Sequence, residues 1–462
     1  MIIGIDDTDS RKGMCTTYLC AVLVGELERF GQVSRPRLVR LNPCVPFKTR
    51  GNGAVSFEVR VARAEARAEA RAEARAEEVK KVKEVVKSRV SEFSELGEEG
   101  TNPGVVFVEE QNSGLGKGEI GVLKRFYEDA VREVLTLEDA CEVISELRLD
   151  CFGLKNRRGL IGALAAASFL VLQRSQKTRS QKTGLCDCDY DFTYELVAYR
   201  RRERWGTRRI IDEASVWRAA AATYPLVWDT VDAANKQVVF APHSPCPVLF
   251  GLRGDSVEAI YKAYELIQPN AEPVERAELF VTNQGTDFHL IDTRKKREEK
   301  LELQDDRSYI LDGVVCSNPR TIKGGHTVFS LSLSLPAGSE EEKLECIAYE
   351  PTKGFRAVVR RLRVGDEVTV YGSLKKGAVN LEKLEVRKLN LLEVRNPRCE
   401  RCGKAMKSAG RSQGYRCKRC GTFCAEKEVK EEERGVLKGF YEVPPVARRH
   451  ISKPLVRTRL SK

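Results

Sequence analysis

MIIGIDDTDS, residues 1–10, places three aspartates directly behind a short apolar run. The run has the length and β-branched content of a buried strand, and helix-compatible residues follow from Thr16 to Phe30. Further strands are expected at residues 37–41 and 54–61, after a loop punctuated by proline. This order of strand, acidic loop, helix and strands predicts an α/β layer at this end of the chain.

Length and composition indicate a multidomain globular protein. The 462 residues are two to three times the usual size of one domain, so we expect three or four domains. No apolar run approaches the roughly 20 residues needed to cross a bilayer, and the first residues lack the long apolar stretch of a secretory signal. We therefore expect a cytoplasmic protein that does not enter a membrane.

The pattern along the chain predicts five segments. An α/β lobe at 1–185 contains an Ala/Arg/Glu-rich tract at 62–77, interpreted as a helical repeat expansion without chemistry, and a direct RSQKT repeat at 174–183, interpreted as a flexible joint. The segments that follow are a small α+β domain at 186–275, alternating strands at 276–392, a zinc ribbon at 395–425 and a basic tail at 426–462. The alternating strands suggest a Greek-key barrel of the OB type, which commonly holds single-stranded nucleic acid, with a barrel that binds no ligand as the alternative.

Cysteine spacing gives the most specific signal. The fifteen cysteines are odd in number and regular in spacing only near the end of the chain, which favours metal ligation over disulfides. Two C-x2-C pairs, Cys399 with Cys402 and Cys417 with Cys420, stand 14 residues apart. Four thiolates can surround a tetrahedral Zn²⁺ and leave no position for water, so the zinc is expected to be structural. Cys424 is interpreted as a bystander.

Positive charge is confined to the same end of the chain. Residues 395–462 hold 19 Lys and Arg against 7 Asp and Glu, an excess of 12 that equals the net charge of the whole chain. Clustered cations favour polyanions because bound phosphates release counterions, although a solubilising tail would look similar. Six ribbon side chains suit phosphate contacts: Lys404, Lys407, Arg411, Arg416, Lys418 and Arg419.

The acidic loop is the second functional signal. Asp6, Asp7 and Asp9 are costly to ionise together unless a cation neutralises them, and hard oxygen ligands suit Mg²⁺ with nucleotide phosphates. A solvated turn with one aspartate as helix cap is the alternative. Thr16 and Thr17 stand where a helix N-terminus would favour a phosphate, although threonines there are ordinarily caps.

Two glycine-containing turns carry weaker signals. The loop SGLGKG at 113–118 could wrap phosphates but is not a Walker A sequence. Lys155 and Asn156 precede Gly159 and Gly162, which again places a polar turn before a small-residue helix. Close helix packing explains these glycines equally well.

Several motifs in a fixed order resemble the archaeal tRNA(Ile2) 2-agmatinylcytidine synthetases along the whole chain. They are GIDDTDS, GMCTTYL, TRGNGAVSFEV, KNRRGLIGALAA, PVLFGLRG, the OB-like strands, the zinc ribbon and ARRHISKPL. The resemblance implies a kinase-like α/β catalytic lobe, a ferredoxin-like α+β domain, an OB-fold and a C-terminal zinc ribbon. It also implies joining of agmatine to C2 of the wobble cytidine, C34, of the isoleucine tRNA with a CAU anticodon, so that the tRNA reads AUA. ATP is consumed to AMP, and phosphorylation of the cytosine O2 lets the amine displace phosphate.

Roles for individual residues follow from the same resemblance. Asp6, Asp7 and Asp9 would hold Mg²⁺ and the triphosphate, and Thr16 matches an autophosphorylated threonine. Lys155, Asn156 and Gly159 would border ATP. Agmatine, a dication, is expected near residues 242–254, where Cys246 stands in place of an aspartate. The ribbon together with Arg448, Arg449, His450 and Lys453 would hold the tRNA while its base is extracted from the stack. No obligate protein partner is implied.

Two other functions compete with this interpretation. A non-enzymatic OB and zinc-ribbon protein would only bind single-stranded nucleic acid, but GIDDTDS with GMCTT argues against it. An adenylating or thiolating tRNA enzyme would keep ATP and tRNA with other chemistry. The lack of an SGGxDS pyrophosphatase-type loop and of a catalytic cysteine pair in the N-terminal lobe disfavours that class.

Overall fold

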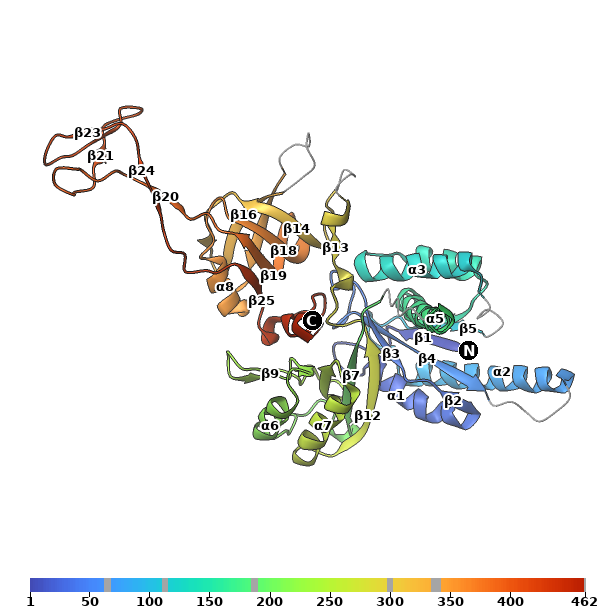
Figure 1. Ribbon diagram of the computed structural model, residues 1–462. Helices are drawn as coiled ribbons and strands as arrows, with labels where there is room; N and C mark the ends of the chain where they lie inside the picture. Colours follow the sequence, from blue (N-terminus) through green and yellow to red (C-terminus); the bar gives the residue numbers. More distant parts are fainter. Residues whose placement is uncertain (62–67, 110–114, 184–189, 297–301, 334–341, 461–462) are drawn as a thin grey trace.

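The computed structural model describes residues 1–61, 68–109, 115–183, 190–296, 302–333 and 342–460. A large mixed sheet flanked by helices forms the body, a β-barrel lies beside it, and a small ribbon projects from the barrel (Figure 1). The α-helices of the described residues are α1 Thr16–Leu27, α2 Ala68–Phe93, α3 Lys117–Arg132, α4 Leu137–Glu146, α5 Leu160–Thr183, α6 Glu213–Thr223, α7 Val257–Ile267, α8 Gly354–Val359 and α9 Leu455–Leu460. None of them is long and apolar enough to span a membrane.

The body is built on one ten-stranded sheet in the order β6-β5-β1-β4-β3-β12-β7-β11-β8, with β2 paired to β4. Its strands are β1 Ile2–Asp6, β2 Gly31–Val33, β3 Arg37–Arg40, β4 Gly53–Val61, β5 Gly104–Val108, β6 Asp150–Gly153, β7 Thr193–Arg200, β8 Val227–Trp228, β11 Val248–Gly254 and β12 Val274–Thr282. A β9–β10 pair, Val231–Asp232 with Gln237–Val238, stands apart. The two α/β units expected as separate domains therefore share a continuous sheet.

Strand β12 joins the two halves of this sheet. It runs antiparallel to β7 and parallel to β3, where Val281 stands opposite Arg37 and Thr282 opposite Leu38. Its stretch ELFVTN, residues 278–283, lies within the range 276–392 that we expected to form the barrel. An alternating pattern indicates a strand but not its partner, so the expected boundary falls inside a strand of the body.

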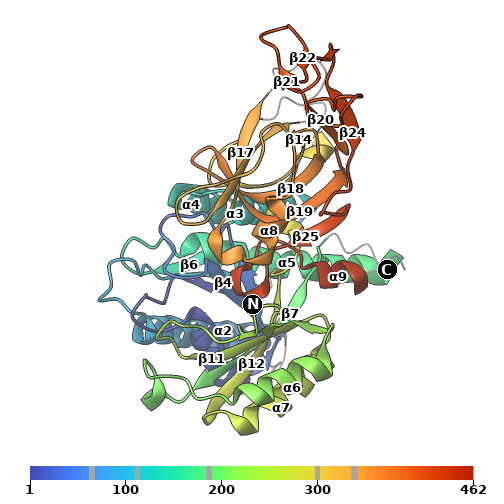
Figure 2. The same cartoon turned by 90° about the vertical axis from the view of Figure 1, so that its left-hand side faces the viewer.

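Helices cover both faces of the sheet because the central strands alternate their side chains between two cores. Ile2, Val106 and Val108 face α3, α4 and α5, whereas Ile3, Ile5, Val105 and Phe107 face α1 and α2. Helices α6 and α7 cover the β7–β11 end of the sheet (Figure 2). Gly4 lets α5 lie on β1, since a Cβ there would stand 2.0 Å from the carbonyl oxygen of Ala163.

Two low-complexity segments belong to helices. Residues 174–183, expected as a flexible joint, continue α5, because Gln, Lys and Arg extend a helix readily once a buried turn precedes them. Within the Ala/Arg/Glu tract, residues 68–77 begin α2, and residues 62–67 lie outside the described residues. Val82, Val86 and Val90, later in α2, are fully buried at helical spacing.

The second sheet closes into a five-stranded barrel of β14, β18, β19, β17 and β16, since β16 also pairs with β14. The strands of this sheet are β13 Ile291–Asp292, β14 Ser308–Val315, β15 Arg320–Thr321, β16 Thr327–Leu333, β17 Lys343–Ala348, β18 Glu367–Lys375, β19 Ala378–Lys388 and β25 Gly439–Glu442. A two-stranded arm carries a three-stranded ribbon, built of β20 Leu392–Arg395, β24 Glu428–Glu431, β21 Lys407–Ser408, β22 Tyr415–Arg416 and β23 Phe423–Cys424. After the ribbon, the chain returns through β25 to α9 on the body (Figure 2).

Candidate active site and zinc centre

A cavity of about 330 Å³ opens where the acidic loop, the first turns of α1 and α5, residues 38–53 and residues 239–253 meet. Among the residues singled out from the sequence, Asp6, Asp7, Asp9, Thr16, Gly159 and Cys246 line it. The segment expected to receive agmatine therefore faces the segment expected to hold ATP.

The acidic loop is shaped by its contact with α5. Asp7 adopts a left-handed backbone, with φ of 58°, and its amide donates to Asp6 Oδ1 at 2.7 Å. A Cβ added to Gly162 would stand 1.9 Å from Asp6 Oδ2, and one added to Gly159 would stand 2.6 Å from the Asp6 carbonyl oxygen. The two glycines thus let the helix pack directly against the aspartate.

Burial disfavours the ionised form of the carboxyl groups in this loop. It raises the pKa of Asp6 well above its usual range, and the neighbouring charge of Asp7 raises it further. Burial raises the pKa of Asp7 to about 6, although the Arg158 guanidinium at 3.2 Å offsets part of this effect. Asp9 is better neutralised, because Arg50 Nε donates to it at 2.9 Å and Thr49 Oγ1 at 3.0 Å. A divalent cation on these oxygens would relieve the charge on Asp6 and Asp7.

Two helix N-termini border the loop. α1 begins at Thr16 after an extended Cys15 that makes no capping side-chain hydrogen bond, and neither α1 nor α5 has an acidic residue in its first turn. Thr16 is buried, and its Oγ1 accepts a hydrogen bond from Thr8 Oγ1 at 3.0 Å. Because backbone N–H groups at helix N-termini attract anions, this end of the cavity suits a polyphosphate.

The opposite wall carries a buried carboxylate that the sequence analysis missed. Glu195 lies between two guanidinium groups, with Arg40 Nη2 and Arg253 Nε each 3.2 Å from one of its oxygens. Burial alone would raise the pKa of Glu195, but Arg253 and Arg40 lower it below its usual value. The available signal was a single glutamate within the apolar strand YELVAYR. Arg50 and Arg158 were also missed, although both stand inside quoted motifs.

Lys155 and Asn156 lie outside the lining of the cavity. Lys155 Nζ donates to the carbonyl oxygen of Glu98 at 2.6 Å, and Asn156 Oδ1 accepts from the Arg158 amide at 3.1 Å. They shape the turn before α5, and Arg158 is the residue of this turn that reaches the acidic loop. In the glycine-rich loop, Lys117 and Gly118 form the start of α3, and residues 113 and 114 lie outside the described residues.

The predicted four-cysteine cluster is confirmed. The Sγ atoms of Cys399, Cys402, Cys417 and Cys420 all lie within 4.8 Å of one another, as tetrahedral zinc ligation requires, and across the described ranges no other His, Cys, Asp or Glu group is as compact. The predicted phosphate contacts Arg411, Arg416, Lys418 and Arg419 are exposed around it. Their side chains make no hydrogen bond or ion pair with the described part of the chain.

The four basic residues predicted near the end of the chain have partners within the protein. Arg448 pairs with Glu442 at 2.7 Å and with Asp229 at 2.8 Å, and Arg449 pairs with Glu382. His450 is half-buried, with its ring centroid 5.3 Å from that of His289, and Lys453 pairs with Asp191 at 3.1 Å. We use the name C-terminal segment for residues 444–460.

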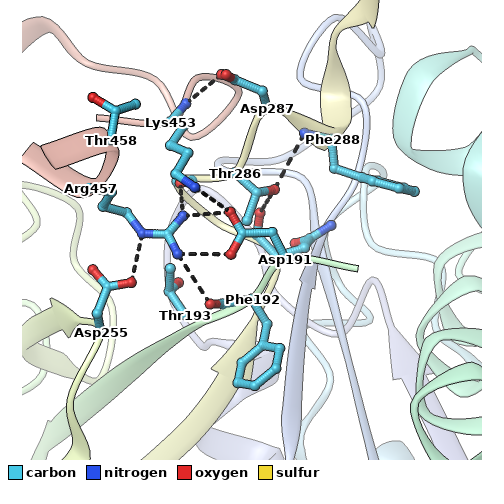
Figure 3. A network of polar contacts seen from close by, with 12 residues as sticks. Asp191, Phe192, Thr193, Asp255, Thr286, Asp287, Phe288, Lys453, Arg457 and Thr458 are labelled. Carbon is cyan, nitrogen blue, oxygen red and sulfur yellow. Dashed lines mark hydrogen bonds and ion pairs between the residues drawn. The ribbon is translucent and has the colours of Figure 1, made fainter. Parts of the chain in front are cut away.

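Figure 3 shows how this segment is fastened. Arg457 lies at the centre of the network, with Nη2 2.9 Å from Asp191 and Nε 2.8 Å from Asp255. Its Nη1 also donates to the carbonyl oxygen of Gly285 at 2.6 Å, and Lys453 lies beside it. These contacts join the C-terminal segment to three separate parts of the body.

Comparisons with known proteins show the family to which the chain belongs. Family models described as the TiaS TCKD domain, the TiaS FLD domain and the TiaS C-terminal zinc ribbon domain match residues 2–156, 157–289 and 396–436. The tRNA(Ile2) 2-agmatinylcytidine synthetase TiaS of Methanosarcina mazei is 45% identical over 99% of this chain and 97% of its own length. That of Archaeoglobus fulgidus is 45% identical over 98% of this chain and 97% of its own length.

Two solved structures are similar over almost the whole chain. A complex of TiaS with tRNA(Ile2) and ATP has a TM-score of 0.81 at 44% identity, covering 99% of this chain and 97% of that one. A complex of TiaS with tRNA(Ile2), AMPCPP and agmatine has a TM-score of 0.78 at 42% identity, covering 99% and 96%. The chain belongs to the tRNA(Ile2) 2-agmatinylcytidine synthetase family, as its motifs predicted.

Proposed function

We propose that this protein is an ATP-dependent ligase that joins agmatine to C2 of the wobble cytidine, C34, of tRNA(Ile2). The observation that carries the proposal is the single cavity in which the acidic loop, the start of α1 and residues 239–253 meet. A nucleotide triphosphate, an amine and one extracted base need such a common space, because each reacts with another at bonding distance.

The acidic end of the cavity is the proposed ATP site. Asp6, Asp7 and Asp9 offer oxygen ligands for Mg²⁺, which would neutralise the phosphates when bound. The N-termini of α1 and α5 would receive phosphate oxygens. Arg50 and Arg158 place further positive charge beside them.

The chemistry needs the poor leaving group O2 of cytosine to be activated. Cleavage of ATP to AMP supplies the phosphoryl group that is transferred to O2. The amine nitrogen of agmatine then attacks C2 and loses a proton, and the C2–O2 bond breaks so that the oxygen leaves with the phosphate. We assign Thr16 Oγ1, at the cavity wall, as the transient phosphoryl acceptor. The hydrogen bond from Thr8 would hold this oxygen in place.

Glu195 is the proposed counter-charge for agmatine, because Cys246 offers no carboxylate where an aspartate was expected. Cys246 Sγ accepts from Ser244 at 3.3 Å and lies 3.5 Å from Arg209 Nη2. Glu195 lines the same cavity as Cys246, and its oxygens already hold two guanidinium groups, so they suit the guanidinium of agmatine.

The remaining modules would hold the tRNA. We propose that the body divides into a kinase-like and a ferredoxin-like part, that the barrel is an OB-fold and that the exposed ribbon cations contact phosphates. The place of action proposed is the cytoplasm, with tRNA, ATP and agmatine as the partners.

Mass spectrometry of transcribed tRNA(Ile2) tests the function. With enzyme, ATP, Mg²⁺ and agmatine, C34 should gain the mass of agmatine minus water. Asp7→Asn and Thr16→Val should each slow product formation by at least about 100-fold while RNA binding persists. Asp139→Asn, which replaces an exposed aspartate at the start of α4, is the matched control and should retain full activity.

An unmodified C34 despite tight RNA binding and bound zinc would favour the rival function, a non-enzymatic protein that binds single-stranded nucleic acid. Full activity of Thr16→Val would leave the ligase intact and remove only the phosphoryl-acceptor role of Thr16.

A further inference from the structure

A second cavity, of about 350 Å³, adjoins the first and shares Arg40, Lys48, Gly51 and Arg253 with its wall. The C-terminal segment closes it with Arg448, Arg449 and His450. None of the three aspartates of the acidic loop lines it. It therefore opens beside the proposed reaction space, away from the end that suits ATP.

Cations dominate this cavity. Arg40, Lys48, Arg253, Arg448 and Arg449 line it against a single carboxylate, Asp229. His450 adds no charge near neutral pH, because burial lowers its pKa well below the usual value.

The other carboxylates that balance these arginines lie outside the lining of this second cavity. Glu195 pairs with Arg40 and Arg253, Glu442 with Arg448, and Glu382 with Arg449. The carboxylates orient the guanidinium groups while leaving the cavity itself rich in N–H donors.

Two of the lining cations have unused binding capacity. Lys48 Nζ donates to the Pro43 carbonyl and has no carboxylate partner in the described part of the chain. Burial lowers the pKa of Lys48, and the nearby charges of Arg449 and Lys375 lower it further, although Cys44 opposes them. Arg449 Nη2 is buried without a hydrogen-bond partner, which costs free energy that an anion reaching it would recover.

We propose that this cavity binds a phosphodiester group of the RNA strand beside the nucleotide whose base enters the reaction cavity, with Lys48 and Arg449 as its contacts. The inference rests on the proposed function, since an enzyme that extracts one base must hold the neighbouring backbone. Pyrophosphate released from ATP has the same phosphate chemistry and is the other source. The separation from the acidic loop favours RNA.

The salt dependence of RNA binding tests the site in the absence of ATP. Lys48→Met keeps the aliphatic stem, and Lys48→Glu reverses the charge. We expect the Kd for tRNA(Ile2) to rise about three- to tenfold for the first and more for the second. The slope of log Kd against log salt should become shallower by about 0.7 to 1, the share of one phosphate contact. Lys262→Met on α7, whose amine also donates only to a carbonyl, is the matched control and should change neither quantity.

Pyrophosphate titration and circular dichroism complete the experiment. Folded Lys48 variants that bind pyrophosphate more weakly but keep the RNA salt slope would overturn the RNA assignment. Variants that change neither would overturn the site as a whole. If the Lys48 variants change the salt dependence of tRNA binding but the protein makes no agmatinylated tRNA, the phosphate site is supported and the proposed ligase is refuted. Failure of the site and failure of the proposed function can therefore be distinguished.

Discussion

The acidic loop and the C-terminal segment have opposite charges and opposite electrostatic situations. In the loop, burial raises the pKa of Asp6 and Asp7 because nearby cations do not fully compensate for lost water. In the C-terminal segment, Arg448 and Arg457 each pair with two carboxylates at short distances. In these two regions, the uncompensated charge of the loop favours the binding of a cation, whereas the compensated charge of Arg448 and Arg457 attaches the segment to the body. Both regions are rich in charge in the sequence, and only the pairing separates their roles.

The largest expected effect on stability comes from the ion pairs that join the C-terminal segment to the body. Arg457, whose side chain is 5% exposed, leaves Asp191 and Asp255 without its charge when replaced. Arg457→Met should lower the free energy of unfolding by about 2–3 kcal/mol, less than for a fully buried pair because the side chains of Asp191 and Asp255 are 41% and 23% exposed. Urea denaturation followed by tryptophan emission measures this well, since the three tryptophans stand at 205, 217 and 228, in the part of the body that the segment contacts.

Lys453→Met is the control, because Lys453 also pairs with Asp191 but through a more exposed side chain. This substitution should lower the free energy of unfolding by at most about 1 kcal/mol. Equal losses for the two variants would mean that the network around Arg457 does not hold the segment.

In the acidic loop, we expect a substitution that raises the free energy of unfolding, by a smaller amount. Because the folded-state pKa of Asp7 is raised to about 6 from an ordinary 3.8, the folded protein holds more protons than the unfolded chain between these values. Stability of the ligand-free protein therefore falls as pH rises through that window. Asp7→Asn should raise the free energy of unfolding by about 1–2 kcal/mol at pH 7.5 and leave it unchanged at pH 4. The gain at pH 7.5 already allows for the lost ion pair with Arg158.

Urea denaturation at the two pH values, without nucleotide or Mg²⁺, checks this prediction. Glu142→Gln, at an exposed position of α4, controls for a general change of charge. A loss of stability at pH 7.5, or an equal gain at both pH values, would show that the loop is not strained by its charge.

The smallest expected effect is on the ribbon, which sharpens the contrast with the paired arginines. The double variant Arg416→Gln, Arg419→Gln removes exposed cations, so stability should be unchanged. The Kd for tRNA should rise a few-fold and the salt slope should fall by up to about 2. Fluorescence anisotropy over a salt series measures both, with Lys81→Gln on α2 as the control. Unchanged RNA binding would favour a solubilising role for the ribbon charges.

Local patterns in the sequence predicted local structure well. The C-x2-C spacing was sufficient for the metal cluster, because four ligands on two tight turns need little information from the rest of the fold. The apolar run before Asp6 and the helix from Thr16 likewise follow from short-range periodicity.

Long-range pairing could not be predicted in the same way. Nothing near Arg457 indicates Asp191 or Asp255 as its partner, and nothing near ELFVTN indicates a parallel neighbour at residue 37. Glu195 has a clear role only once β7 brings it between Arg40 and Arg253. Such pairs depend on the whole topology, which residue patterns restrict but do not determine.

The parallel pairing of β3 with β12 has a consequence for synthesis on the ribosome. β3 emerges early, yet its neighbour in the sheet is complete only at residue 282. Until then one edge of the nascent sheet has unpaired backbone groups, and α5, which covers β1, β4 and β5, arrives only by residue 183. The body should therefore fold late and as a unit, and a fragment cut at residue 156, where two family models meet, would lack both the cover and the neighbour of its own strands.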